Sequence, residues 1–284
     1  MVIYGPTASG KSDLSDLAGD LLSEGFSTYS QVMVVDSMQV YKEIPIITNQ
    51  HRSRPAELTG IVSVSQEWTM AHHRAACDEL AIKAKSPFVL DVGTGMYLNS
   101  ILLDIPISPR VPERLRKQAE SQSSDESNPR RASRELELEL AGAEQRGSIW
   151  EGSLRYDVEM MYLRPERSAL DTSIAARSSK ITRNGLQEAL ALTEMLPEGI
   201  PNRSVKESIG VKELVLHTEG MLSLEEAERQ IHIRTRRLAR RQLRWFDKLT
   251  KTLTGRTNTT VSEEPISLQK PIEDYVNKCQ EFYA

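Results

Sequence analysis

The feature that most constrains this chain is the segment Gly5-Pro-Thr-Ala-Ser-Gly-Lys-Ser12, a complete G-x-x-x-x-G-K-[ST] phosphate loop. It follows the apolar run Val2–Tyr4 and precedes a helical pattern that begins at Lys11, which is the strand–loop–helix context that the motif requires. Glycines let backbone N–H groups turn toward phosphate oxygens, Lys11 supplies a mobile cation, and the Ser12 hydroxyl can ligate Mg²⁺. The motif predicts a nucleotide-type loop for a diphosphate or triphosphate, but it does not establish ATP hydrolysis. The loop residues are Gly5, Pro6, Thr7, Ala8, Ser9, Gly10, Lys11 and Ser12.

Two further apolar runs, Val32–Val35 and Phe88–Leu90, repeat the buried-strand signal, and an amphipathic helical pattern over residues 66–85 lies between them. Continuous apolar strands that alternate with helices indicate an α/β fold with a parallel sheet covered by helices on both faces. Later helices are predicted over residues 130–143, 166–184, 186–196, 223–251 and 271–282, and later strands over residues 158–163 and shortly after Gly255.

The composition changes after Asp104. Residues 105–112 hold three prolines, and residues 119–128 are too polar to build a core, so we expect a mobile excursion there. We divide the chain into a phosphate-loop core formed by residues 1–111 and 155–284, with a helical C-terminal part, and a small inserted segment, helical and mobile, formed by residues 112–154.

Several protein classes are excluded at this stage. Only two cysteines are present, Cys77 and Cys279, which excludes a disulfide framework and a four-cysteine zinc site. No apolar run approaches the roughly 20 residues of a membrane span, and no secretory signal is apparent. The net charge of −4 does not by itself favour nucleic-acid binding. We expect a cytoplasmic monomer without membrane contact.

Two aspartates follow or end predicted strands near the phosphate loop. Asp36 lies at the carboxyl end of the second strand, where open parallel sheets bind their ligands, and it could accept a proton or hold Mg²⁺ through water. Asp91 ends the run Phe88-Val-Leu-Asp91, which would suit a magnesium-binding carboxylate of a P-loop kinase or NTPase. The glycine-rich turn that follows Asp91 is better suited to close approach of a substrate.

Six blocks in the sequence carry a resemblance to a known family. They are Gly5–Ser12, Asp36-Ser-Met-Gln-Val-Tyr-Lys42, Val92-Gly-Thr-Gly-Met-Tyr-Leu98, Asn128-Pro-Arg-Arg-Ala-Ser-Arg-Glu135, Ser208-Ile-Gly-Val-Lys-Glu-Leu214 and Thr235-Arg-Arg-Leu-Ala-Arg-Arg-Gln-Leu-Arg-Trp-Phe246. In this order, and over nearly the whole chain, they resemble the tRNA dimethylallyltransferases, also called tRNA isopentenyltransferases. The inserted segment is shorter than that of the family.

The resemblance implies transfer of a dimethylallyl group from dimethylallyl diphosphate to N6 of the adenine at position 37, beside the tRNA anticodon, with Mg²⁺ as cofactor. It implies that Asp36 accepts the N6 proton, that Thr94 supports this arrangement, and that Lys11 and Arg177 act on the leaving diphosphate. Met38 and Met96 are expected to line the prenyl channel. The residues expected to bind the diphosphate are Thr7, Ala8, Ser9, Gly10, Lys11, Ser12 and Arg177, with Ser12 as the Mg²⁺ ligand.

An adenine in an anticodon stem-loop must be flipped out to reach such a site, and cations must hold the RNA backbone. Arg237 and its neighbours project from one broad face of the long predicted helix, and the inserted segment is expected to add contacts. The residues expected to contact tRNA are Asp36, Ser37, Met38, Gln39, Arg130, Arg131, Arg134, Ser208, Gly210, Lys212, Arg240, Arg241, Gln242 and Arg244.

Three other functions stay open. The short insertion resembles that of adenylate isopentenyltransferases, which prenylate free AMP, ADP or ATP, although the arginine blocks are not needed for a free nucleotide. Asp91 leaves a P-loop kinase or NTPase open, and an RNA-binding module without catalysis is the fourth function considered.

His72 and His73 are adjacent and face different directions on a helix, so we expect a surface or capping role rather than a metal pair. We expect Cys77 to be a buried apolar residue.

Overall fold

The computed structural model describes the chain except for residues 109–110, 123–128, 144–146 and 284, and the side chains of residues 129–131 and 283. Five parallel strands form one sheet in the order β2-β3-β1-β4-β5. Their bounds are β1 Val2–Tyr4, β2 Val32–Val35, β3 Val89–Val92, β4 Glu159–Leu163 and β5 Asn258–Ser262. The α/β class, the all-parallel sheet and the short strand near the C-terminus are therefore confirmed.

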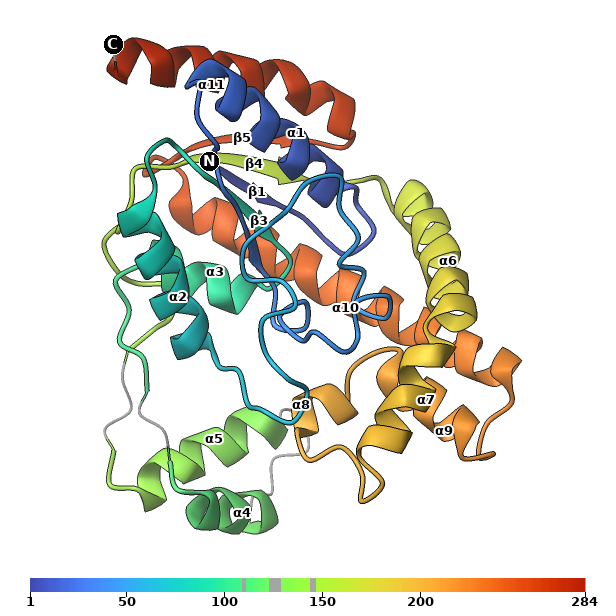
Figure 1. Ribbon diagram of the computed structural model, residues 1–284. Helices are drawn as coiled ribbons and strands as arrows, with labels where there is room; N and C mark the ends of the chain where they lie inside the picture. Colours follow the sequence, from blue (N-terminus) through green and yellow to red (C-terminus); the bar gives the residue numbers. More distant parts are fainter. Residues whose placement is uncertain (109–110, 123–128, 144–146, 284) are drawn as a thin grey trace.

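Helices cover both faces of this sheet (Figure 1). One face is covered by α1 (Lys11–Gly25) and α11 (Gln269–Tyr283), which pack on Ile3 of the central strand. The other is covered by α2 (Met70–Lys83), α3 (Gly95–Leu102) and α10 (Leu224–Leu253), which enclose Tyr4 and its neighbours. Because successive residues of a strand point to opposite faces, both faces of these short strands must be apolar, as their composition predicts.

A second apolar cluster lies beside the sheet and is built by α6 (Arg167–Asn184), α7 (Leu186–Met195), α8 (Arg203–Lys206) and α9 (Val211–Thr218) with the segment after β2. Ile47 of that segment is buried against Ile181. The carboxylate of Glu188 accepts hydrogen bonds from the backbone N–H groups of Ile46 and Ile47, at 2.6 and 2.8 Å, and fixes the turn. The helical C-terminal part is thus joined to the core through its own apolar contacts.

Within the inserted segment, which the sequence predicts to be helical and mobile, residues 113–122 form helix α4 (Glu113–Gln122), while the mobility of the segment stays a prediction. Helix α4 packs beside α5 (Pro129–Leu140), and Ala119 and Leu138 are buried. Two helices can bury a few small residues against each other even where the sequence between them is polar, and a composition argument misses this pairing. Residues 123–128, the rest of the polar stretch, lie outside the described residues.

The pair of helices α4 and α5 is attached to the core by ion pairs. Arg203 of α8 pairs with Glu120 of α4 at 2.5 Å, and Arg116 of α4 pairs with Glu67 at 3.3 Å. All four side chains are exposed, and exposed ion pairs contribute little free energy and weaken with salt. These two ion pairs therefore hold the helix pair against the core only weakly.

Helix α2 begins at Met70, four residues later than expected, because Thr69 and His72 form a capping box at its start. The capping role expected of His72 is confirmed, and so is the burial of Cys77. The expectation for His73 is wrong, because this side chain is fully buried, accepts a hydrogen bond from Trp68 Nε1 at 3.0 Å and packs against Tyr97. The helix turns His73 and Cys77 inward together, one turn apart.

In the described part of the chain, no helix combines the length and the apolar content that crossing a bilayer would need.

Burial of His73 makes the stability of the fold depend on pH. Desolvation lowers the pKa of this imidazole to about 4, below the roughly 6.5 of an unfolded histidine. Between these two values the unfolded chain binds a proton that the folded chain does not, so the free energy of unfolding falls as the pH drops from 6.5 toward 4. We expect His73→Gln to remove up to about 3 kcal/mol of this dependence, measured by urea unfolding at several pH values. His51→Gln, at an exposed site, should leave it intact, and an unchanged pH profile in His73→Gln would contradict the assignment.

Candidate active site

The strand register explains why the candidate residues meet. Tyr4 of β1 is aligned with Val92 of β3, which is aligned with Val35 of β2. The residues that follow these three positions are therefore neighbours at the carboxyl edge of the sheet: Gly5, Gly93 and Asp36. A Cβ atom on Gly93 would collide with Oδ2 of Asp36, so only glycine allows this approach. Asp36 therefore lies at the carboxyl edge of the sheet, as the sequence predicted, while its role in a site at this edge stays a prediction.

The phosphate loop has the backbone that anion binding requires. Ala8 and Gly10 adopt left-handed conformations, with φ of 63° and 85°, and helix α1 starts directly after Gly10. Such alternation turns successive N–H groups inward, and the helix N-terminus adds a positive dipole end. The Ser9 hydroxyl is buried and has no hydrogen-bond partner among the described residues. A buried hydroxyl without a partner costs free energy, which a phosphate oxygen would recover.

Asp36 and Thr94 are fixed by backbone contacts. Oδ1 of Asp36 accepts hydrogen bonds from Met38 N at 2.8 Å and Gln39 N at 3.3 Å. The Thr94 N–H donates to the Val35 carbonyl, and its Oγ1 accepts from Ser37 N at 3.1 Å. The carboxylate is thus held by one oxygen, with the other directed to the Gly93 turn.

Two cations approach this carboxylate. Lys11 is buried, and its Cε lies 3.7 Å from the position that a Cβ of Gly93 would take. Arg177 of α6 is half-buried; burial lowers its pKa, and the negative charge of Asp36 acts in the opposite direction. Neither side chain forms an ion pair or a hydrogen bond within the described chain. Two cations without direct partners beside a phosphate loop are available to a polyphosphate ligand.

Asp91 has a partner that the sequence did not predict. Arg52 pairs with Asp91 and with Asp16 of α1, each at 2.5 Å, and donates to the carbonyl oxygen of Ser12 at 3.2 Å. Burial alone would lower the pKa of Arg52, but Asp91 and Asp16 outweigh burial and raise it. The carboxylate that a kinase would use for Mg²⁺ is therefore neutralised by a buried arginine.

The motif predicts that the hydroxyl of Ser12 is a direct Mg²⁺ ligand. The Ser12 hydroxyl forms no hydrogen bond with any described residue, so its oxygen is available. Across the same residues, no group of three His, Cys, Asp or Glu side chains could enclose a metal ion. The residues therefore fit a Mg²⁺ held by Ser12 together with phosphate oxygens and water, which is how this ion is commonly bound.

Several residues expected to contact RNA already have partners inside the protein. Lys212 pairs with Glu207 at 2.7 Å, the Ser208 hydroxyl donates to the Val205 carbonyl, and Arg134 pairs with Glu137 at 2.7 Å. Gly210, with φ of 96°, packs against Ile47 in the second cluster. The side chains of Arg130 and Arg131 lie outside the described residues.

Helix α10 carries the other expected RNA contacts. Its exposed face presents arginines that form no ion pair among the described residues: Arg237, Arg240, Arg241 and Arg244. Together with Arg164 and Asp247 they line an open groove of about 600 Å³. Gln242 lies on a different side of the helix, hydrogen-bonded to Thr7 and Gly93. Met96 is exposed, whereas Met38 packs at the edge of the second cluster; a prenyl-lining role for both stays a prediction.

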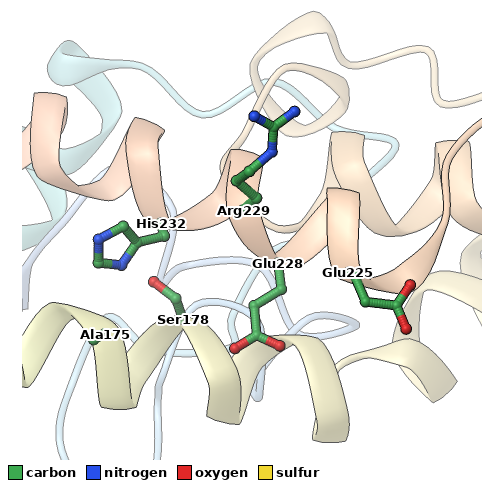
Figure 2. Close-up of a pocket in the computed structure, with 6 residues that line it drawn as sticks. All are labelled: Ala175, Ser178, Glu225, Glu228, Arg229 and His232. Carbon is green, nitrogen blue, oxygen red and sulfur yellow. The ribbon is translucent and has the colours of Figure 1, made fainter.

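A second hollow, of about 350 Å³, lies between α6 and α10 and contains none of the expected site residues (Figure 2). Figure 2 shows the carboxylate of Glu228 reaching toward α6, whereas Arg229 extends away from it. Arg229 pairs instead with Glu226 of its own helix. The acidic lining does not suit a phosphate ligand.

Comparison with known proteins gives the family. The model of the IPP transferase family matches residues 39–249, most of the chain. A tRNA dimethylallyltransferase of Rubrobacter xylanophilus is 53% identical over 268 residues, which cover 93% of this chain and 92% of that protein. The chain belongs to the IPP transferase family.

Solved structures of this family share the fold. The tRNA isopentenylpyrophosphate transferase of Bacillus halodurans has a TM-score of 0.71 at 23% identity and covers 99% of this chain and 96% of its own. A eukaryotic dimethylallyltransferase acting on tRNA has a TM-score of 0.72 at 23% identity, over 98% of this chain and 79% of its own. At this level of identity the structural matches show a shared fold, whereas membership in the family is shown by the sequence matches.

The Arg52 cluster generates a stability prediction. Arg52→Met leaves the carboxylates of Asp16 and Asp91 buried without their cation, and we expect the free energy of unfolding to fall by about 3–5 kcal/mol in urea titrations. Arg183→Met, at an exposed arginine of α6, should change it by less than about 0.5 kcal/mol. A loss below about 1 kcal/mol in Arg52→Met would show that the cluster does not hold the loop.

Proposed function

We propose that this chain transfers a dimethylallyl group from dimethylallyl diphosphate to N6 of the adenine that follows the anticodon in tRNA. The observation that carries the proposal is the convergence of Asp36, Lys11 and Arg177 on one phosphate loop, in a chain whose close relatives are named tRNA dimethylallyltransferases. A fixed carboxylate opposite two cations suits a reaction in which a nitrogen nucleophile attacks a carbon while a base takes its proton and an anionic group leaves that carbon.

The loop side of the site acts on the leaving group. As the allylic C–O bond breaks, negative charge grows on the diphosphate, and Lys11, Arg177 and the loop amides stabilise that charge. The Ser9 hydroxyl, which is buried and has no hydrogen-bond partner in the described part of the chain, would donate one further hydrogen bond. A Mg²⁺ ion on the Ser12 hydroxyl would add neutralising charge to the same group.

The opposite wall acts on the nucleophile. The N6 nitrogen attacks the allylic carbon, the new N–C bond forms, and its proton passes to the free oxygen of Asp36. Hydrogen bonds from Met38 N and Gln39 N hold the other oxygen, so the base is oriented before the substrate arrives. Thr94 borders the same space and orients the Ser37 backbone.

The alternative of a P-loop kinase or NTPase is disfavoured by the Arg52 pair, because Asp91 is neutralised and not available to Mg²⁺. The exposed arginines of α10 favour a polyanion over a free nucleotide as the acceptor. Nothing in the described site favours AMP as the acceptor.

A test of the base is Asp36→Asn. The amide keeps the size of the side chain but cannot take the N6 proton, so we expect the rate of label transfer from radioactive dimethylallyl diphosphate into tRNA to fall by about 10²–10⁴-fold. Asp13→Asn, at an exposed position of α1, is the matched control. Full activity of Asp36→Asn would remove the general base from the proposal.

The same assay separates the acceptors. Label that enters AMP instead of tRNA would identify an adenylate isopentenyltransferase, and phosphate release from ATP alone would identify an NTPase. Retention of tRNA without any transfer would leave an RNA-binding module.

The exposed face of α10 gives a second prediction. Arg241→Ala should weaken tRNA binding about 5- to 10-fold and lower the slope of log affinity against log salt by about 1, while the affinity for inorganic diphosphate stays unchanged. Filter binding at several salt concentrations measures both quantities. Arg183→Ala serves as a control for the loss of one surface charge, and an unaltered tRNA affinity in Arg241→Ala would count against this face as an RNA contact.

A further inference from the structure

Gln242 of helix α10 joins the two sides of the site through one side-chain amide. Its Oε1 accepts a hydrogen bond from Thr7 N in the phosphate loop, at 2.8 Å. Its Nε2 donates to the carbonyl oxygen of Gly93, at 2.7 Å. Thr7 N can only donate and Gly93 O can only accept, so the orientation of the amide is fixed by its partners. No other type of side chain of this length provides both a donor and an acceptor in one plane.

The position of the two Gln242 hydrogen bonds in the fold matters more for the site than their strength. The ladder between β1 and β3 ends at Tyr4 and Val92, and beyond that point no strand pairing links the two backbones. Gln242 supplies a cross-connection at this place. On one side it holds the loop that carries Lys11, and on the other it holds the turn that contacts Asp36. The amide therefore ties the loop on the diphosphate side of the site to the turn on the side of the base.

The helix that carries Gln242 is itself held in place on both sides. Leu243 and Ala8 of the phosphate loop pack against the same small apolar cluster, and Trp245 fills the space above Gly95, where even a Cβ atom would clash with its ring. Trp245 Nε1 also donates to Asn99 Oδ1 at 3.2 Å. Gln242 is thus presented from a rigid element, which is what a residue that sets a distance requires.

We propose that Gln242 is a positioning residue: it sets the distance between the diphosphate loop and the wall formed by Asp36 and Thr94, and it does not contact RNA. The family resemblance placed Gln242 among the tRNA contacts, but its carbonyl oxygen and its NH₂ group each already bind a backbone atom of the protein. The proposal rests on the function proposed above for the transfer step, while its effect on the loop does not require that function.

The experiment compares Gln242→Met, which keeps the length of the side chain without either hydrogen bond, with Gln242→Asn, which keeps the amide but is one methylene too short to reach both partners. We expect kcat for transfer into tRNA to fall about 10- to 100-fold in both, since a small misplacement of reacting groups has effects of this size. The Kd for tRNA should stay within about twofold of the parent, because no RNA contact is lost. Gln230→Met, at a hydrogen-bonded glutamine elsewhere on the same helix, is the matched control and should leave all values unchanged.

Binding of inorganic diphosphate to the enzyme alone, by calorimetry, provides a readout that does not need turnover. We expect a loss of about fivefold or more in Gln242→Met, because the loop is no longer held at Thr7. If the parent protein binds diphosphate but transfers nothing to tRNA, the proposed function fails while this readout still tests Gln242. Parent-like kcat and diphosphate affinity in both variants would overturn the proposal, and so would a loss of tRNA affinity that parallels the loss of kcat. Circular dichroism identifies any variant that fails to fold, and the other variant then decides.

Discussion

The register of the parallel ladder is the constraint on which the site depends. Because β2, β3 and β1 end in one row, the first residue after each strand is delivered to the same edge, and no long-range interaction has to be invoked to bring Asp36, Gly93 and Gly5 together. A slip of one residue in any of these pairings would exchange the side chains that the strand presents to the two faces and would move Asp36 away from the loop. The energy that fixes the site is thus the burial of the strands themselves.

The cations of the chain fall into two groups by their partners. Arg52, Arg234 and Arg236 are each paired with carboxylates, and they hold elements together. Lys11 and Arg177 have no such partner among the described residues and lie at the loop, and the arginines of the exposed α10 face are likewise unpaired there. An unpaired cation retains its full attraction for an anionic ligand, and this is why the proposed binding roles are given to the second group.

Much of the core could be predicted because its signals are local. The phosphate loop, the strands and most helices follow from apolar runs and turn residues that lie within a few positions of each other. The pairing of Arg52 with Asp91 joins residues 39 positions apart, and the contact of Gln242 with Thr7 spans 235. A single sequence shows that such residues are polar but not which of them meet. The burial of His73 could not be predicted for a related reason. A histidine next to a capping histidine gives no sign of which face of the helix the fold will bury.

Helix α10 runs for 30 residues without a break, about 45 Å at the usual rise per residue. Its first turns pack on α9, its middle touches the phosphate loop, and its last turns complete the core under the sheet. A helix that is packed against the rest of the protein at three places along its length cannot unfold at one of them alone. Amide hydrogens in the stretch of this helix around Gln242 should therefore exchange with solvent as slowly as those of the sheet, and we expect the sheet edge that carries Asp36 to unfold together with the rest of the tertiary structure in a single cooperative event.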